Sequence, residues 1–140
     1  MLRIYCVILL ILISFRALAS DLVISQAVIH LAPPGAKALA AYMTIDNHQL
    51  QPIIITEVSA DCCAMAMFHR TRYENHQAWM EQVVPLTIAP GETLTLIPGK
   101  MHLMLMGPKA PLIEGDSVLI RFSFSTGQQS VSVPVVRADE

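Results

Sequence analysis

The sequence Lys-Met-His-Leu-Met-Leu-Met-Gly, at residues 100–107, alternates in a way that predicts a β-strand with two different faces. One face would carry His102, Met104 and Met106. An imidazole beside thioethers is a ligand combination that suits soft metal ions. The strand is therefore either half of a metal site or a methionine-rich core segment, and the rest of the chain must decide. The other face would carry ordinary core residues, namely Met101, Leu103 and Leu105.

Short apolar segments separated by turn residues flank this strand on both sides. Proline and glycine punctuate the chain, and no segment longer than about ten residues has a helical period. The 140 residues are enough for one domain with its core. These features predict an all-β sandwich or barrel in a single domain. The other predicted strands cover residues 23–29, 39–46, 52–59, 65–73, 78–84, 93–97, 117–124 and 130–136.

Residues 1–19 have the three parts of a secretory signal peptide. Arg3 gives a positive start, residues 4–15 form an almost unbroken apolar run, and Ala-Leu-Ala at 17–19 is a small-x-small cleavage signal. The run is shorter than the roughly 20 residues that a membrane-spanning helix needs. We therefore expect cleavage, a mature domain over residues 20–140, and no stable membrane insertion of that domain.

Two residues bear on how the leader is processed. Arg16 lies close to the cleavage signal, which leaves an uncleaved membrane anchor as the alternative. Cys6 lies inside the apolar run and no cysteine stands at the cleavage point, so we expect no lipid attachment.

The charge of the mature chain narrows the class of partner. Losing residues 1–19 removes two arginines and no acid, which changes the formal net charge from −2 to −4. Nucleic acids and anionic lipids both favour a basic surface, so neither is expected as a partner. The mature chain keeps seven of the eight methionines and all five histidines, an unusual supply of soft and borderline ligands.

A predicted hairpin over residues 65–84 supplies a second imidazole and thioether. If its turn is centred between Glu74 and Asn75, His69 lies directly opposite Met80, with their Cβ atoms roughly 5 Å apart. A turn one register longer would leave the two side chains as diagonal neighbours on the same face.

If the hairpin meets His102 and Met104 at one edge of the fold, the result is a site of two histidines and two methionines. These neutral, soft ligands favour Cu(I) over harder divalent ions. Methionine also avoids the disulfide chemistry that threatens cysteine in an oxidising compartment. A closed set of four ligands leaves no open position for a substrate, so it suits holding and transferring an ion rather than catalysis.

The spacing of these residues resembles the motif of the periplasmic copper chaperone family PCu(A)C. Ten residues separate His69 from Met80, twenty-one separate Met80 from His102, and Met104 completes a His-x-Met. The resemblance covers essentially the whole mature chain. Flanking segments are also similar to the family sequences, at residues 40–47, 88–93, 98–107 and 112–116.

The resemblance implies a cupredoxin-like, Greek-key β-sandwich that is located in the periplasm and is not an enzyme. It implies Cu(I) as the bound ion, with His69, Met80, His102 and Met104 as its ligands. It further implies delivery of copper to the copper centre of cytochrome c oxidase, and we expect the protein to be a monomer. The expected partners are a copper-accepting oxidase subunit and other periplasmic copper carriers.

Cys62 and Cys63 depart from the family pattern, and their adjacency leaves three interpretations open. They are structural or incidental thiols, a vicinal disulfide or redox pair, or additional copper contacts. We expect core or pocket positions for Met65, Met67, Met101 and Met106, a core position for Trp79, and a solvated His76 at the hairpin tip.

Two other functions compete with copper transport. An electron-transfer cupredoxin would need a Cys thiolate with two His and a weak axial Met. A secreted β-sandwich interaction module would need no metal, and its methionines would simply be core.

Overall fold

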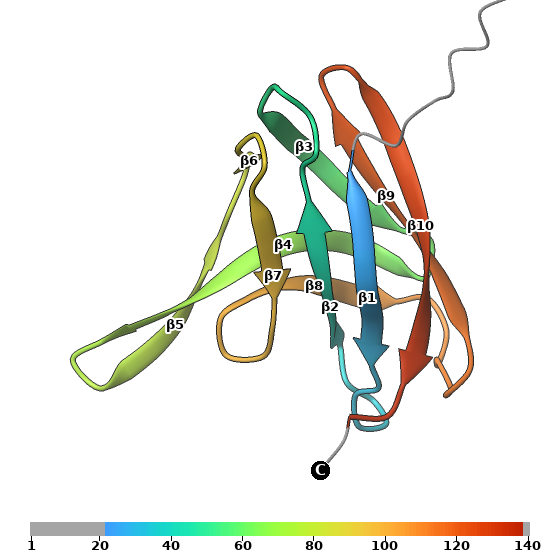
Figure 1. Ribbon diagram of the computed structural model, residues 1–140. Coiled ribbons are helices and arrows are strands. Elements are labelled where there is room, and N and C mark those ends of the chain that lie inside the picture. The colour runs from blue at the N-terminus through green and yellow to red at the C-terminus, as the bar shows by residue number, and fades with distance from the viewer. Residues whose placement is uncertain (1–21, 139–140) are drawn as a thin grey trace, which may run out of the picture.

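In the computed structural model, which describes residues 22–138, the chain contains ten strands and no helix within that range (Figure 1). The predicted all-β fold is thus confirmed. The predicted signal peptide at residues 1–19 lies outside the described residues and stays a prediction. The strands are β1 (Val23–His30), β2 (Ala38–Asp46), β3 (Ile53–Ala60), β4 (Cys63–Glu74), β5 (Gln77–Gln82), β6 (Leu86–Ile88), β7 (Thr93–Leu96), β8 (Met101–Pro108), β9 (Ser117–Phe124) and β10 (Gly127–Val136).

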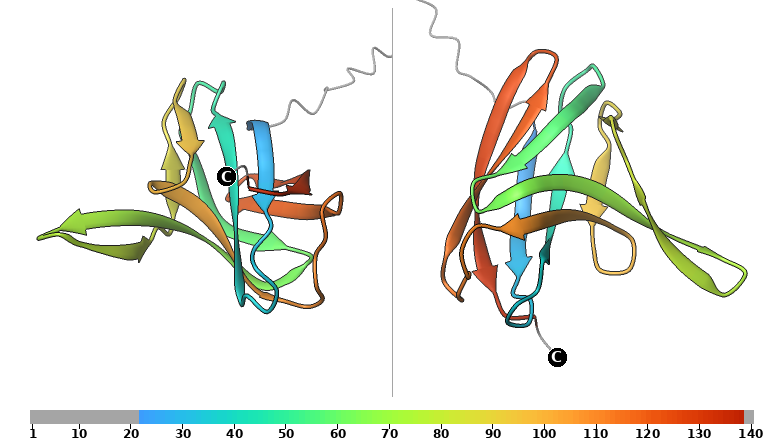
Figure 2. Two further views of the ribbon diagram at one scale, coloured as in Figure 1. Left: turned by 90° about the horizontal axis from the view of Figure 1, so that it is seen from below. Right: turned by 180° about the vertical axis from the view of Figure 1, so that it is seen from behind.

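The strands form one curled sheet in the order β5-β4-β8-β2-β1-β10-β9-β3-β6, with β7 paired to β2. β1 and β10 are parallel, and the other pairs among the described strands are antiparallel. Because the sheet curls, β4 and β8 cross behind β1 and β2 in Figure 1, and they lie side by side at the front when the molecule is seen from behind (Figure 2). The inner face of the curl encloses the core, and its outer face meets solvent.

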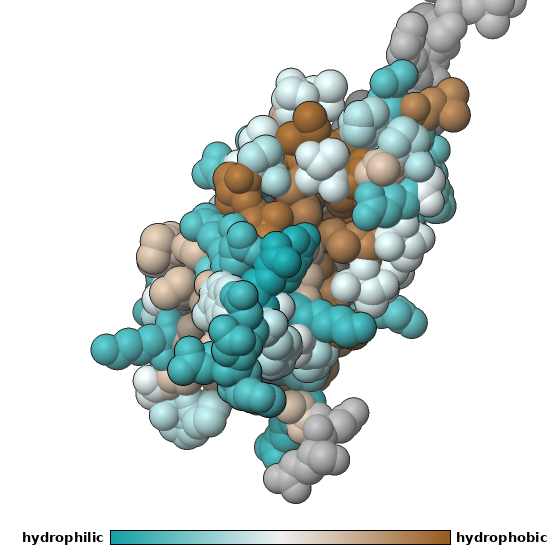
Figure 3. Space-filling view, turned by 90° about the vertical axis from the view of Figure 1, so that its left-hand side faces the viewer, coloured by the Kyte–Doolittle hydropathy of each residue, from teal (hydrophilic) through white to brown (hydrophobic). Residues whose placement is uncertain are grey.

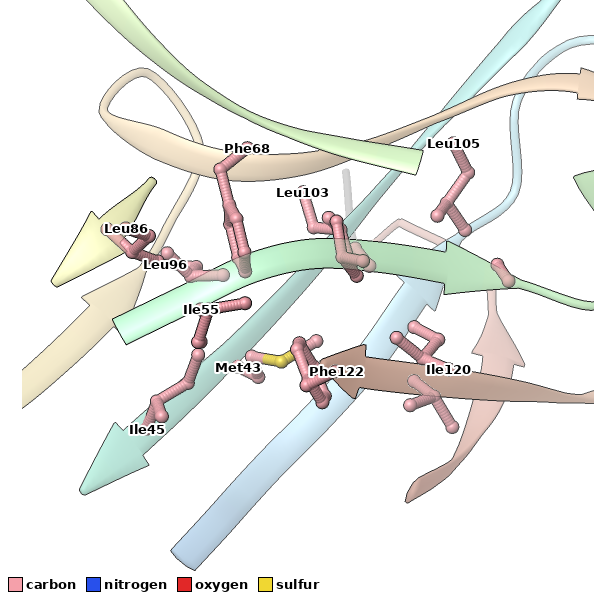
Figure 4. Packing of buried hydrophobic residues seen from close by; sticks show 14 of the residues in the cluster. Met43, Ile45, Ile55, Phe68, Leu86, Leu96, Leu103, Leu105, Ile120 and Phe122 are labelled. Carbon is pink, nitrogen blue, oxygen red and sulfur yellow. The ribbon is translucent and has the colours of Figure 1, made fainter. Parts of the chain in front are cut away.

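The core forms because apolar residues alternate along each strand. Phe68 of β4 and Phe122 of β9 stack inside the curl with their ring centroids 6.3 Å apart (Figure 4). Each such fully buried side chain contributes roughly 1.5–3 kcal/mol relative to an exposed one. Strand β2 shows the alternation most regularly, with Leu39, Ala41, Met43 and Ile45 buried.

Strand β8 has the two faces that its sequence predicts. Its buried inner residues are Met101, Leu103 and Leu105. On the outer face His102 is buried, while Met104 and Met106 are half-buried. The potential ligands of this strand therefore lie outside the core, on a partly covered surface.

The Asn47 side chain links the end of β2 to the end of β6 by hydrogen bonds. Its side chain is fully buried and its Nδ2 donates hydrogen bonds to the carbonyls of Gln51, Ile88 and Ala89 at 2.9, 3.0 and 3.2 Å. Its Oδ1 accepts a hydrogen bond from the backbone N–H of Gln49. A buried amide with all its groups paired is stabilising, since the same groups unpaired would each cost about 1–3 kcal/mol.

The β4–β5 hairpin extends away from the curled sheet (Figure 2), and every residue of β5 is exposed. Its two-residue turn is Asn75-His76, with φ values of 49° and 62°. Positive φ at both central residues is the backbone of a type I′ turn, and asparagine tolerates it well. The hairpin therefore turns one residue later than the sequence analysis assumed.

Candidate metal site

The candidate site is built on the pairing of β4 with β8. His69 lies opposite His102 in this antiparallel pair, and Met67 lies opposite Met104. Residues at alternate positions of a strand share a face, so all four side chains lie on the outer face of the sheet. The hairpin and the His-x-Met strand, which we expect from the sequence to meet, lie directly beside each other.

The predicted pairing of His69 with Met80 is wrong in register. His69 lies opposite Gln82, and Met80 lies opposite Thr71. The cause is the turn at residues 75–76, which shifts the pairing by two residues. An even shift keeps each side chain on its face, so Met80 and His69 remain diagonal neighbours, as the longer-loop alternative anticipated.

The two imidazoles stand close enough to share one ion. The ring centroids of His69 and His102 are 6.0 Å apart, and the rings are tilted by 38°. A metal bound to an imidazole nitrogen at about 2.0–2.1 Å lies about 3 Å from the ring centre, so two rings on one ion have centres about 5–6 Å apart. The observed separation falls at the upper end of that range.

The surroundings of His69 favour a neutral ring with a free lone pair. Its Nδ1 atom is buried and has no hydrogen-bond partner. Burial, and in second place the positive charge that His102 can carry, lower the pKa of His69 below its ordinary value of 6.5. A buried polar atom without a partner is uncommon in proteins and calls for an explanation. A ligand to a metal ion is one such explanation.

The two methionines share a cleft of about 480 Å³ on the outer face with His102, whereas His69 does not line it. Met80, His102 and Met104 all line the cleft. Met104 is half-buried, whereas Met80, on the projecting hairpin, is 55% exposed. His102 is only 5% exposed. The site thus has a covered side formed by β8 and an open side formed by β5.

The same cleft contains residues to which the sequence analysis assigned no role. His30 and Tyr42, from β1 and β2, contact each other edge to face with ring centroids 4.9 Å apart. Burial raises the pKa of Tyr42 above 10.0, so its phenol stays protonated at neutral pH. Tyr73 lines the hairpin side. Alternation along their two strands places His30 and Tyr42 on the outer face, and this pattern could have indicated them from the sequence.

The thioethers matter to the candidate site because few other ligand types gather among residues 22–138. Within that range no group of three or more His, Cys, Asp or Glu side chains is arranged to hold a metal ion. Cys62 and Cys63 are joined in a vicinal disulfide. The interpretation as free structural thiols is therefore wrong, and the bonded sulfurs provide no thiolate for a metal.

The remaining methionines fall into two sets. Met101 lies in the core, as predicted. Met65 is 52% exposed and lines a pocket together with Met67, which agrees with the pocket alternative of the prediction and not with the core. Met67 and Met106 are half-buried on the same outer face. These side chains are outside the core because β4 presents this face to solvent rather than to a second layer of the fold.

Trp79 is not in the core. Its side chain is 45% exposed and lies beside Arg72, Tyr73, Glu74 and Glu81 on the hairpin. Trp79 and Met80 do lie on opposite faces of β5, as predicted, but the hairpin projects from the rest of the sheet and has no core on either face. His76 at the turn is exposed, as predicted.

Seen from the side on which the hairpin projects, hydrophilic residues cover the centre and the lower part of the molecule, and hydrophobic residues lie above them (Figure 3). The hairpin itself carries an ion pair of Arg72 and Glu81, with 2.8 Å between Nε and Oε2. This exposed pair adds little stability. The end of the hairpin therefore meets water on all sides, while its base carries the methionine of the candidate site.

A helix capable of crossing a bilayer is absent from the part of the chain that the structure describes.

Solved structures with this fold include copper-bound proteins. The Cu(I) form of DR1885 from Deinococcus radiodurans is 34% identical to this chain with a TM-score of 0.68, over 91% of this chain and 87% of that one. The copper-bound PCuAC domain from PmoF2 has a TM-score of 0.70 at 16% identity, over 84% and 94% of the two chains. The second likeness concerns the fold alone. The chain is thus a cupredoxin-like β-domain of the PCuAC type, as the resemblance implied.

The chain belongs to the LpqE-like family, described as "Putative lipoprotein LpqE-like", whose profile matches residues 22–135. The "Putative lipoprotein Lxx21020" of Leifsonia xyli subsp. xyli is 33% identical over 103 residues, which are 72% of this chain and 62% of that protein. The chain therefore spans about three fifths of that relative's length. "Uncharacterized protein RP573" of Rickettsia prowazekii is 26% identical over 124 residues, or 81% and 68% of the two chains.

Proposed function

We propose that this domain carries one Cu(I) ion between His69, Met80, His102 and Met104. The observation that carries the proposal is the direct opposition of the two histidines on the outer face of β4 and β8, with 6.0 Å between their ring centroids. Met104 follows His102 at the next position on that face, and Met80 is the diagonal neighbour of His69. The ion is cargo, held by the site and handed on.

The ligand chemistry supports Cu(I) rather than a harder ion. Two thioethers and two neutral imidazoles carry no negative charge, and soft sulfur ligands select monovalent copper. Among the described residues no acidic or cysteine-rich set competes for a divalent ion. The lowered pKa of His69 keeps that ring unprotonated at neutral pH, which is the form that binds metal.

The position of Met80 suits release by ligand exchange. Met80 is the most exposed of the four residues and lies on β5, the edge strand next to β4 in the sheet that residues 22–138 form. An incoming ligand from a recipient can replace this thioether while His69, His102 and Met104 still hold the ion. The exposed Tyr73 and Trp79 of the same hairpin offer aromatic contact area to such a recipient.

We propose the periplasm as the compartment and the copper centre of cytochrome c oxidase as the destination. The likeness to the Cu(I) form of DR1885, at 34% identity, supports copper binding, and the leader-like sequence at residues 1–19 supports export. The family resemblance supports the oxidase as recipient and a carrier rather than an enzyme. A closed set of four ligands also leaves no position for a reacting substrate.

The two competing functions have less support. An electron-transfer cupredoxin needs a Cys thiolate, and the two cysteines of the described chain are bonded to each other. An interaction module with a methionine core would bury its methionines, whereas Met65 and Met80 are both more than half exposed.

A copper-transfer experiment tests the proposal. The Cu(I)-loaded protein is mixed with a soluble, copper-free oxidase domain, and the copper in each is measured after separation. We expect the ion to move to the oxidase domain, and we expect the Met80→Leu/Met104→Leu variant to bind Cu(I) far more weakly than the parent. Parent-like Cu(I) affinity in that variant contradicts the ligand assignment, and retention of all copper by the carrier contradicts the assignment of the recipient.

A further inference from the structure

The outer face of β4 and β8 continues past the proposed site as a ladder of potential ligands. The His69–His102 pair is followed by Met67 opposite Met104, and then by Met65 opposite Met106. Three successive cross-strand pairs thus consist entirely of imidazole or thioether side chains. The four-ligand site uses only the first pair and one member of the second.

The unused methionines of the ladder are not explained by packing. Core methionines of this protein are almost fully buried, at 2% exposure for Met43 and 6% for Met101. Met65 is 52% exposed, and Met67 and Met106 are half-buried. Methionine in a core fills gaps, but these three face outward, where a polar side chain would suit solvent better.

We propose that Met65, Met67 and Met106 form a second site, which binds a soft monovalent cation, Cu(I) or its analogue Ag(I). Directly opposed residues such as Met65 and Met106 have Cβ atoms roughly 5 Å apart, and Met67 follows Met65 on the same face at about 6.6 Å. Three unbranched, flexible thioethers at those separations can converge on one ion. Sulfur alone, without nitrogen or oxygen, selects the softest cations.

Charge around this second site permits a second cation. Glu57 lines the same pocket, of about 250 Å³, as Met65 and Met67. Its carboxylate attracts a cation bound there. Two or three residues along the strand separate the sites, about 7–10 Å. Repulsion between the two ions at about 8 Å lowers the affinity for the second by between ~2-fold and ~30-fold, for dielectric constants from 80 to 20. The domain thus has a capacity of two ions, filled in order.

The second site rests on the proposed function only in that its neighbour is taken to be the site of two histidines and two methionines. Methionine-methyl NMR distinguishes ion binding at one site from ion binding at the other. The purified protein, labelled with ¹³C at its methionine methyl groups, is titrated with Ag(I), which does not change its oxidation state. We expect the first equivalent to shift Met80 and Met104, and the second to shift Met65, Met67 and Met106. The core methionines Met43 and Met101 serve as internal references that stay in place.

Native mass spectrometry of variants completes the test. We expect two Ag(I) ions on the parent and one on Met65→Leu/Met106→Leu, with first-site affinity within about 2-fold of the parent. A Met101→Leu variant, changed on the buried face of the same strand, should still bind two. Saturation of the parent at one ion, with Met65, Met67 and Met106 unshifted, overturns the second site. Shifts at those three residues without any at Met80 and Met104 support the second site and contradict the first.

Discussion

Replacing Met80 with leucine should separate metal binding from folding. Met80 is 55% exposed, on a strand with no core contact, so Met80→Leu should change the free energy of unfolding by less than about 0.5 kcal/mol. The same change removes one of four proposed ligands. We expect Cu(I) affinity to fall by at least ~10-fold, equivalent to about 1.4 kcal/mol of binding free energy. The predicted loss of binding thus exceeds the predicted loss of stability.

The matched control is Met101→Leu, on the buried face of β8. Met101 is 6% exposed, so a volume-conserving change there should cost up to about 1.5 kcal/mol of stability and leave Cu(I) affinity unchanged. Anaerobic competition against a chromophoric Cu(I) chelator gives the affinities, and thermal unfolding of the apo proteins gives the stabilities. Equal loss of affinity in both variants, or parent-like affinity in Met80→Leu, would contradict the role of Met80 as a ligand.

Three further predictions concern protonation, folding and processing. Because the pKa of His69 is lowered in the folded protein, the unfolded chain takes up a proton first as the pH falls below 6.5. The free energy of unfolding of the apo protein should therefore decrease from pH 6.5 down to the folded pKa. Denaturation of His69→Gln at several pH values should show a weaker dependence of this free energy on pH. Asn47→Ala, which leaves the carbonyl of Ile88 without its buried donor, should lower the free energy of unfolding by roughly 2–3 kcal/mol in urea denaturation, and an unchanged midpoint would contradict that role. Mass spectrometry of the exported protein should show an unmodified chain that begins at Ser20, and a retained leader or a lipid mass would refute the predicted cleavage.

Much of the fold could be predicted because strand alternation is a local property. The two faces of β8, from Met101 to Met106, agree with the sequence pattern residue by residue. The three-residue β6 (Leu86–Ile88) was not predicted, since it is too short to show a period. The exposure of Trp79 was not predicted either. Alternation indicates which face a side chain takes, but whether that face meets a core depends on how far the hairpin projects from the sheet.

The four candidate residues could be proposed from the sequence, but their arrangement in space could not. Spacing along the chain brought His69, Met80, His102 and Met104 together as a set. The register of the hairpin depended on which two residues form the turn, and positive φ at both Asn75 and His76 is not evident from their sequence alone.

The direct opposition of His69 and His102 depends on the pairing of β4 with β8. This contact joins segments more than thirty residues apart, so local patterns do not reveal it. The half-exposed methionine ladder on the same two strands was hidden for the same reason.

X-ray absorption spectroscopy of the protein loaded with one equivalent of Cu(I) tests the central claim most directly. We expect a four-coordinate ion with two sulfur scatterers at about 2.3 Å and two imidazole nitrogens at about 2.0 Å. In Met80→Leu/Met104→Leu the combination of two sulfur with two imidazole nitrogen scatterers should be lost. A parent spectrum with nitrogen or oxygen scatterers alone would contradict the site of two histidines and two methionines, and with it the proposed copper carrier.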